Sequence, residues 1–295
     1  MFGRIALFVA TNILIVVTIS ILTSLLGLNH YMSGSGLDYQ ALFIFCLVWG
    51  MSGSLISLML SRISAKYMMG VQVIDPQNPG SYSGLVTMVH DIARKAGLSK
   101  MPEVGVFQSP EMNAFATGPT KNRALVAVST GILSGMDRSQ LEGVIGHEMT
   151  HITNGDMVTM TLLQGVVNAF VMFLARVIAF ALSQNSKGEN RYMMRYFITF
   201  LLEIVIGMFG MLVVRWFSRR REFKADAGSA KVVGRQEMIS ALQALQARQS
   251  QHDPRTAVEA MAPYKISNST GKRKSSIFAT HPPLEERIAR LTQYA

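Results

Sequence analysis

Four long apolar segments constrain the fold of this chain more than any other feature. They cover residues 5–28, 39–60, 161–183 and 196–214, and a helix needs about 20 such residues to cross a bilayer. The first segment is longer than the apolar core of a typical signal peptide, and no small-residue cleavage pattern follows it. We therefore interpret it as a retained anchor, and the sequence predicts four transmembrane helices.

Basic residues near the ends of these segments predict their orientation. They are Arg4, Arg62, Lys66, Arg215, Arg219, Arg220, Arg221 and Lys224. The turn between the first two segments carries only Asp38, so the positive-inside rule places both termini and residues 61–160 in the cytoplasm. Lys187, Arg191 and Arg195 disagree, because they lie between the third and fourth segments. A re-entrant or partly embedded hairpin is the alternative for that pair.

The remaining sequence predicts a mixed domain outside the membrane. Apolar residues at helical spacing predict an amphipathic helix over residues 81–99. Short strands are expected at 103–107, 113–118 and 123–133, between proline and glycine turns. Further helices are expected at residues 137–154, 220–248 and 281–295, and a loop is expected at 262–276. The resulting division is 1–60, a first transmembrane hairpin; 61–160, a cytoplasmic region; 161–214, a second hairpin; and 215–295, a second cytoplasmic region.

The 137–154 helix carries the sequence His-Glu-Met-Thr-His. His147 and His151 share one helix face, and Glu148 lies about 100° around the axis. Two imidazoles at this spacing with a glutamate after the first are the H-E-x-x-H pattern of zinc metalloproteases, in which the carboxylate is the general base. The alternative is a helix with two surface histidines that bind nothing.

A catalytic zinc site requires a third protein ligand. Glu222 and Asp226 lie one helical turn apart in the segment Glu-Phe-Lys-Ala-Asp. Glu222 is therefore the candidate third ligand, and Asp226 is the candidate acceptor for the free ring nitrogen of a ligating histidine. The alternative is an ordinary surface glutamate beside arginines.

The chain resembles the HtpX membrane-integrated zinc metalloproteases, which are relatives of the CAAX prenyl proteases. Four motifs carry the resemblance in order along the chain: NAFATG, HEMTH, EFKAD and THPP. The resemblance implies a gluzincin-like cytoplasmic catalytic domain and one zinc ion bound by His147, His151 and Glu222. It also implies an endopeptidase of the bacterial inner membrane that degrades misfolded or damaged membrane proteins under stress. The predicted fold class is accordingly α+β, mostly helical, with four transmembrane helices and a small β-sheet in the catalytic domain.

Two further segments gain a functional interpretation from this resemblance. Asn113, Ala114 and Phe115 are expected to bind an extended substrate through main-chain hydrogen bonds, although the residues alone fit an ordinary turn equally well. His281, held before two prolines, is expected to donate a hydrogen bond to the oxyanion that forms on the attacked carbonyl. The alternative for His281 is packing or capping at the start of the last helix.

Composition limits the other classes of function. The formal net charge is +10, but the basic residues crowd the ends of apolar segments and show no RNA-binding pattern, so we expect a lipid bilayer and no nucleic acid as partner. The single cysteine, Cys46, excludes an intrachain disulfide. A transporter would explain Arg176 and Glu203, which lie at similar predicted depth and which we expect to form an ion pair. A non-catalytic zinc scaffold and a CAAX-type protease are the remaining alternatives, and the oligomeric state is left open.

Overall fold

The computed structural model describes residues 36–184, 190–251 and 281–293, with isolated residues between 13 and 33. The chain divides into two compact units. Unit 1 comprises Met1–Leu58 with Thr159–Val214, and unit 2 comprises Met59–Val158 with Arg215–Ala295. Most of the first predicted segment, residues 5–28, and the predicted loop at 262–276 lie outside the described residues. The four-part division proposed from the sequence stays a prediction.

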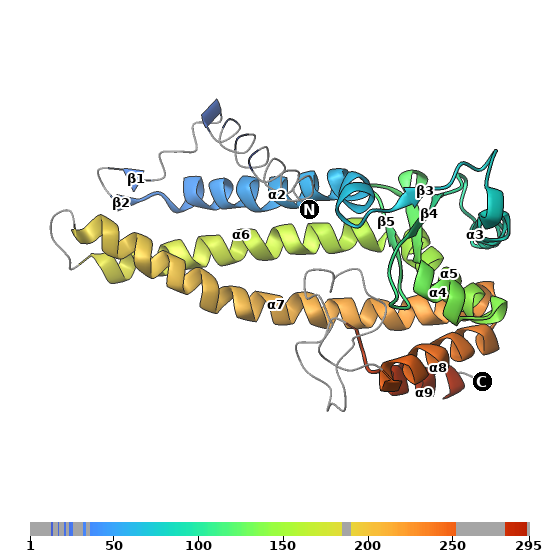
Figure 1. The fold of residues 1–295 in the computed structure, drawn as a ribbon. Coiled ribbons are helices and arrows are strands. Elements are labelled where there is room, and N and C mark those ends of the chain that lie inside the picture. Colours follow the sequence, from blue (N-terminus) through green and yellow to red (C-terminus); the bar gives the residue numbers. More distant parts are fainter. Residues whose placement is uncertain are drawn as a thin grey trace. The chain divides into compact units, whose positions relative to one another are not determined.

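Three helices form the described part of unit 1 and continue along the chain into unit 2 (Figure 1). They are α2 (Tyr39–Met68), α6 (Asp156–Ser183) and α7 (Asn190–Val232). Within the described residues, these three are long and apolar enough to cross a membrane. A short hairpin, β1 (Met32–Ser33) and β2 (Gly36–Leu37), precedes α2. Helix α7 corrects one expectation, since the fourth apolar segment and the first part of the helix expected at 220–248 form one continuous helix.

The helices of unit 1 pack through small residues and one ion pair. Gly50 of α2 lies so close to Gly165 and Ala169 of α6 that an added Cβ would approach their backbone to 2.7 Å. Helices α6 and α7 run antiparallel (Figure 1). Between them, Arg176 Nη1 donates to Glu203 Oε1 at 2.6 Å, which confirms the ion pair predicted from the sequence. Exposed aromatic and aliphatic side chains, such as Phe200 and Phe209, line the unit 1 part of α7, as expected of a helix that faces lipid.

A four-stranded mixed sheet forms one layer of unit 2, in the order β3-β4-β6-β5. Its strands are β3 (Gln72–Val73), β4 (Glu103–Phe107), β5 (Ala114–Thr117) and β6 (Leu125–Ser129). Strands β4 and β6 are parallel, whereas β3 and β5 are antiparallel to their neighbours. Strand β5 is therefore an edge strand. The expected strand at 123–133 was too long, because Ser129 caps a helix there, and β3 was not predicted.

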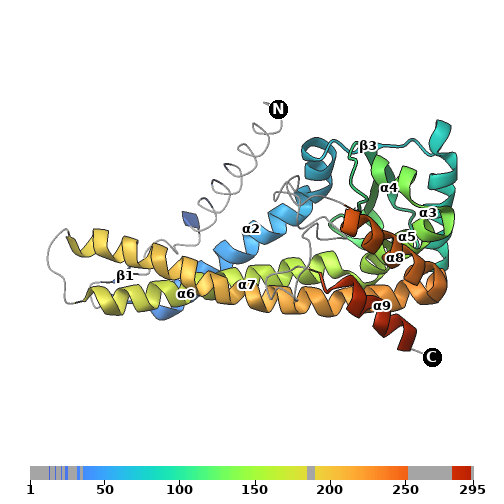
Figure 2. The same ribbon diagram turned by 60° about the horizontal axis from the view of Figure 1, so that its bottom comes forward.

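The helices of unit 2 are α3 (Ser83–Lys95), α4 (Thr130–Gly135), α5 (Arg138–Asn154), α8 (Arg235–Gln251) and α9 (Leu284–Gln293), with short 3-10 turns at Gly80–Tyr82 and Lys121–Arg123. Helix α5 packs against β5 and β6, α3 and α8 pack against α5, and α9 packs against α8 (Figure 2). Val126 and Val128 of β6 join the core beneath the helices, while Leu125 and Ala127 face the residues at the end of α2. This alternation buries both faces of β6 and explains its continuous apolar sequence.

The helix boundaries follow the sequence signals closely. Helix α5 begins with a capping box between Asp137 and Gln140 and ends at Gly155, which adopts the left-handed conformation at φ 70°. The helix expected over 220–248 is interrupted at Gly234, whose φ of 125° ends α7 before α8 begins.

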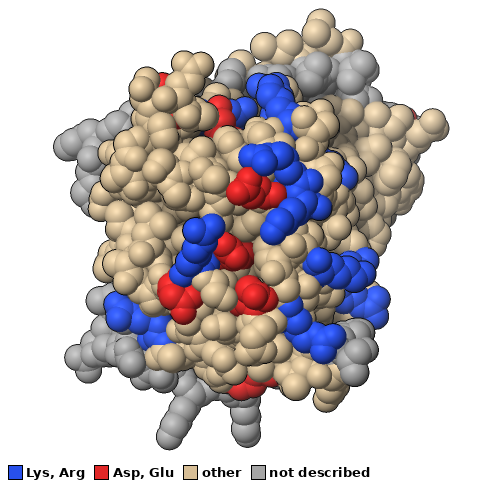
Figure 3. Space-filling view, turned by 90° about the vertical axis from the view of Figure 1, so that its right-hand side faces the viewer, with Lys and Arg blue, Asp and Glu red and all other residues tan. Residues whose placement is uncertain are grey.

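On one face of the molecule, Lys and Arg side chains are interspersed with Asp and Glu over a mostly uncharged surface (Figure 3).

Candidate metal centre

Close packing between α5 and α7 in unit 2 brings the predicted ligands together. Helix α5 carries His147, Glu148 and His151, all buried, and α7 carries Glu222 and Asp226, also buried. A Cβ added to Gly146 would lie 2.6 Å from Ser229 Oγ of α7. The Ser229 hydroxyl donates to the Gly143 carbonyl at 2.8 Å and joins the two helices. Only a glycine at position 146 permits this approach.

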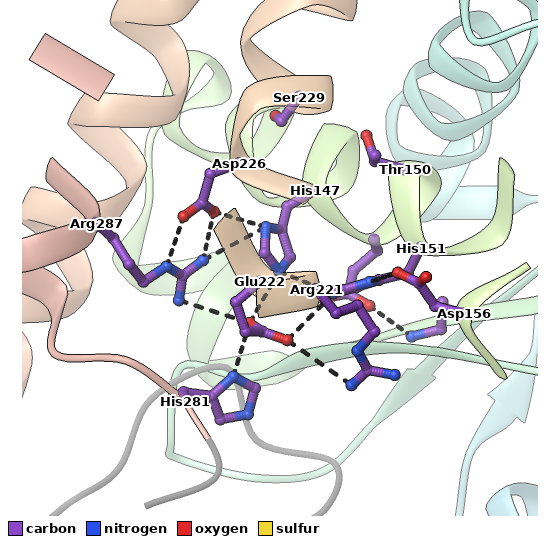
Figure 4. Close-up of polar contacts among 12 residues, drawn as sticks. His147, Thr150, His151, Asp156, Arg221, Glu222, Asp226, Ser229, His281 and Arg287 are labelled. Carbon is purple, nitrogen blue, oxygen red and sulfur yellow. Dashed lines mark hydrogen bonds and ion pairs between the residues drawn. The ribbon is translucent and has the colours of Figure 1, made fainter. Parts of the chain in front are cut away.

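Three donor atoms from these helices converge on one point (Figure 4). The Nε2 atoms of His147 and His151 lie 3.1 Å apart. Glu222 Oε2 lies 3.4 Å from His147 Nε2, and Glu222 Oε1 lies 3.5 Å from His151 Nε2. His147, His151 and Glu222 each offer a ligand atom within 4.8 Å of the others. The structure therefore brings together the three ligands predicted from the sequence.

A carboxylate fixes the orientation of each histidine ring. Asp226 Oδ1 lies 2.9 Å from His147 Nδ1, and Asp156 Oδ2 lies 2.6 Å from His151 Nδ1. With each Nδ1–H donating to its carboxylate, both Nε2 atoms keep their lone pairs for a metal ion, as outer carboxylates ensure in metal sites. Asp226 was predicted for this place. Asp156 was not, although it follows the helix-ending Gly155 directly.

Arg287 of α9 is fully buried beside this cluster. Its Nε and Nη2 atoms donate to the two oxygens of Asp226 at 2.8 and 2.6 Å, and Nη2 also lies 3.4 Å from His147 Nδ1. Arginine is almost never fully buried unless it is paired, and this bidentate contact supplies the pairing. Arg287 thus ties the C-terminal helix to the ligand helices, a role that sequence reasoning missed.

The carboxylates make the cluster favourable for positive charge. Burial opposes protonation of His147, but hydrogen bonds to Asp226 and Glu222 prevail and raise its pKa to about 9. The pKa of His151 is also raised, because Asp156 and Glu222 outweigh burial. Burial works against ionised Glu222, yet His281 and both other histidines hold its pKa well below the usual value. A cation bound among the three donor atoms would be stabilised by the same carboxylates that stabilise a proton on His147 or His151.

Glu148 follows His147 on α5, is buried, and contacts the edge of the sheet. Its Oε2 accepts a hydrogen bond from the Ala116 N–H of β5 at 2.7 Å. Ser129 N–H donates to the Asn113 carbonyl directly opposite, so the main-chain groups of Asn113 and Phe115 face β6, and those of Ala114 and Ala116 face the edge of the sheet, beyond which the structure describes no further strand. The carboxylate beside the first histidine therefore lies next to an open strand edge.

The donor set fits a metal ion. Two imidazole nitrogens and one carboxylate are three protein ligands, as catalytic zinc sites provide. Glu222 Oε1 is buried and has no hydrogen-bond partner among the described residues, although buried polar atoms are normally satisfied. A cation coordinated by Oε1 would satisfy it.

Comparison with known proteins agrees with this geometry. The sequence pattern of peptidase family M48 matches residues 83–295. The chain belongs to peptidase family M48. Proteins described as "Protease HtpX homolog" match along nearly its whole length: 49% identity in Bacillus subtilis over 98% of both chains, and 46% in Methylacidiphilum infernorum over 99% of this chain and 98% of the relative. With its apolar helices, this M48 peptidase is a membrane-bound metalloprotease.

The crystal structure of S. mikatae Ste24p has a similar fold. It superposes with a TM-score of 0.62 at 15% sequence identity and covers 99% of this chain and 67% of that one. This likeness concerns the fold alone. It extends over both units of the M48 peptidase, including the helices that carry the donor atoms.

His281 lies within the cluster of this M48 peptidase. Its Nδ1 atom is 2.7 Å from Glu222 Oε2, so the ring contacts the third candidate ligand. Its expected role as an oxyanion donor stays a prediction. Among the expected substrate-binding residues, the Phe115 ring is buried against Phe107, and its main chain faces β6. Ala114 and Ala116 direct their main-chain groups to the edge of the sheet, and Ala114 is 1% exposed there. Ala116, whose N–H contacts Glu148, lies in the strand expected at residues 113–118.

Proposed function

We propose that this metalloprotease is a zinc-dependent endopeptidase whose zinc ion is held by His147, His151 and Glu222. The observation that carries the proposal is the convergence of three donor atoms beside a buried glutamate and an open strand edge. A bound zinc ion would supply Lewis acidity that polarises a peptide carbonyl and acidifies a water. Asp226 and Asp156 hold the two imidazoles in the tautomer that such an ion requires.

Glu148 is the proposed general base. Its carboxylate accepts the proton of the attacking water and then passes it to the leaving amine. The hydrogen bond from Ala116 N–H fixes the position of the Glu148 carboxylate. His281, in contact with Glu222, is proposed to donate to the oxyanion.

The substrate is proposed to add a strand to the edge of the sheet at β5. The main-chain groups of Ala114 and the carbonyl of Ala116 point to this edge, next to Glu148. An extended peptide that pairs here would place a carbonyl near the proposed base through main-chain bonds, whatever its sequence. Broad specificity follows, and unfolded or misfolded membrane proteins are the proposed substrates.

The proposed location is the bacterial inner membrane, with unit 2 in the cytoplasm and residues 5–28 as a fourth span. The basic residues in the last turns of α2 and within α7 support this orientation. Helix α6, with 28 residues, is long enough to cross a bilayer, so a re-entrant hairpin is not required. Because Cys46 is buried, a single cysteine introduced at Lys100 tests the orientation. It should react with an impermeant reagent only when the cytoplasmic face is accessible.

The alternatives explain less. A CAAX-type protease is not favoured, since the full-length matches are proteins described as HtpX homologues. A structural zinc site has no use for a buried Glu148 between the ligands and an open strand edge. A transporter would leave the converged ligands without a role.

Removal and replacement of metal test the proposal. Protein purified in detergent and treated with a chelator should stop cleaving an unfolded soluble protein, and stoichiometric zinc should restore cleavage. His147→Ala, His151→Ala and Glu222→Ala should each fail to retain zinc. Undiminished zinc in Glu222→Ala would remove Glu222 from the ligand set and direct attention to Asp226.

A further inference from the structure

A cavity of about 940 Å³ lies among α2, α6 and α7, entirely within unit 1. Such a volume is at the upper end of the range of about 300–1,000 Å³ that ligand sites occupy. Its apolar lining includes Trp49, Met172 and Met208. Its polar lining comprises Ser54, Ser57, Thr161, Gln164, Asn168 and Glu203. A cavity within apolar helices therefore presents hydrogen-bonding groups from all three helices.

Two amides dominate the polar lining. Gln164 Nε2 donates to Asn168 Oδ1 at 2.8 Å, and both side chains are exposed. An amide has two donor hydrogens and two acceptor lone pairs. The bond between Gln164 and Asn168 uses one of these four positions on each amide. Within the part of the chain that the structure describes, no second partner of either amide is found.

Glu203 adds a carboxylate to the same lining. One oxygen accepts from Arg176, and its side chain is still 34% exposed. Polar and charged groups inside a membrane are costly and usually face a bundle interior, where they serve a function. Lipid tails offer no hydrogen-bonding atoms, so they leave these groups unsatisfied. A helix that carries polar side chains would satisfy them.

We propose that this cavity binds substrate transmembrane segments that carry polar side chains, with Gln164 and Asn168 as the recognition groups. This inference rests on the proposed proteolytic function and deepens it. Unassembled or misfolded membrane proteins present such side chains to lipid, whereas correctly assembled ones bury them. Helix α6, which carries Gln164 and Asn168, begins at Asp156, and α7, which carries Glu203, also carries Glu222. The helices that line the cavity therefore continue along the chain to residues of the candidate centre. The enzyme would then select its substrates by the polarity of their transmembrane segments.

The test uses two reporter substrates in proteoliposomes with the full-length, zinc-loaded enzyme. Both have one transmembrane span and the same unfolded cytoplasmic tail. One span contains only Leu and Ala, and the other has two Asn residues one helical turn apart. Wild type should cleave the Asn-containing reporter about threefold to twentyfold faster, the range for one interhelical hydrogen bond in a bilayer. The double variant Gln164→Leu with Asn168→Leu should cleave both at the same rate.

Two controls separate this proposal from the catalytic one. Phe170→Leu, on the exposed surface of α6 outside the cavity, should keep the preference. Cleavage of a soluble unfolded protein should be equal in wild type and the double variant, and loss of that cleavage in wild type would instead refute the proteolytic function. An unchanged preference in the double variant overturns the recognition site.

A photo-crosslinker at position 168 identifies the occupant. Crosslinks to the Asn-containing span support the proposal. Crosslinks from position 168 to residues 5–28 of the same chain, or to a second copy, in the presence of that substrate would overturn it, because the cavity would then be closed by the enzyme itself.

Discussion

Replacement of Arg287 by methionine should destabilise the protein strongly. Arg287 is fully buried, and it holds Asp226 through hydrogen bonds of 2.8 and 2.6 Å. Asp226 is 2% exposed, and the pKa of its carboxyl is lowered to about 2, since Arg287 and His147 outweigh the effect of burial. In Arg287→Met this carboxylate stays buried and, among the described residues, keeps only the contact with His147 at 2.9 Å.

The magnitude follows from the cost of an unpaired buried charge. Removal of one partner of a buried ion pair costs about 3–5 kcal/mol. For a domain of about 150–250 residues, 1 kcal/mol corresponds to a shift in Tm of about 2–4 °C. The metal-free Arg287→Met protein should therefore melt about 6–20 °C below wild type. Arg138→Met, which removes an exposed partner of Glu142, should change the Tm little.

A second variant separates stability from metal affinity. In Asp226→Leu with Arg287→Met no buried charge is left unpaired, so the metal-free Tm should return close to that of wild type. His147 then lacks its carboxylate acceptor, and zinc affinity should stay about 10 to 100 times weaker. Melting of the metal-free protein in detergent and zinc competition with a chelator measure the two quantities. A double variant as unstable as Arg287→Met would refute the reasoning about the pair.

Three further predictions concern single contacts. Asp156→Asn should weaken zinc binding about 10- to 100-fold, because His151 Nδ1 loses its carboxylate; unchanged affinity in chelator competition would contradict this. His281→Ala should keep zinc and the Tm of the zinc-loaded protein but slow turnover about 10² to 10³-fold at similar KM, whereas wild-type turnover would assign His281 a structural role. Arg176→Leu should destabilise unit 1 by at least about 2.5–3.5 kcal/mol, and Arg176→Glu with Glu203→Arg should be more stable in detergent than either single charge change; equal instability would argue against the pair.

Local signals in the sequence predicted much of this fold. The capping box at Asp137, the stop at Gly155 and the helix after Pro283 were found because each depends on neighbouring residues. The extra strand β3 was missed, since two residues carry no periodicity. Helix α4 was read as strand because Ser129 ends one element and caps the next. Such boundaries are set by tertiary packing.

The candidate ligands were predictable because their spacing along helices determines which face they share. The helical period alone predicts that His147 and His151 share one face, and the same argument applies to Glu222 and Asp226. Arg287 was not predictable in this way, since its contact with Asp226 spans 61 positions in the sequence. Asp156 lies five positions after His151 across a helix break, where no periodic rule applies. The Arg287 contacts arise only once α5, α7 and α9 meet.

The most direct measurement of the central claim compares zinc content and proteolysis in the same preparations of wild type and Glu148→Gln. Glu148 is buried and follows His147 in the sequence, but it is not one of the three candidate ligands. We predict one zinc ion per chain in both proteins and cleavage of an unfolded substrate by wild type alone. Normal cleavage by zinc-loaded Glu148→Gln would contradict the account, because the buried carboxylate beside the metal would then not be the base.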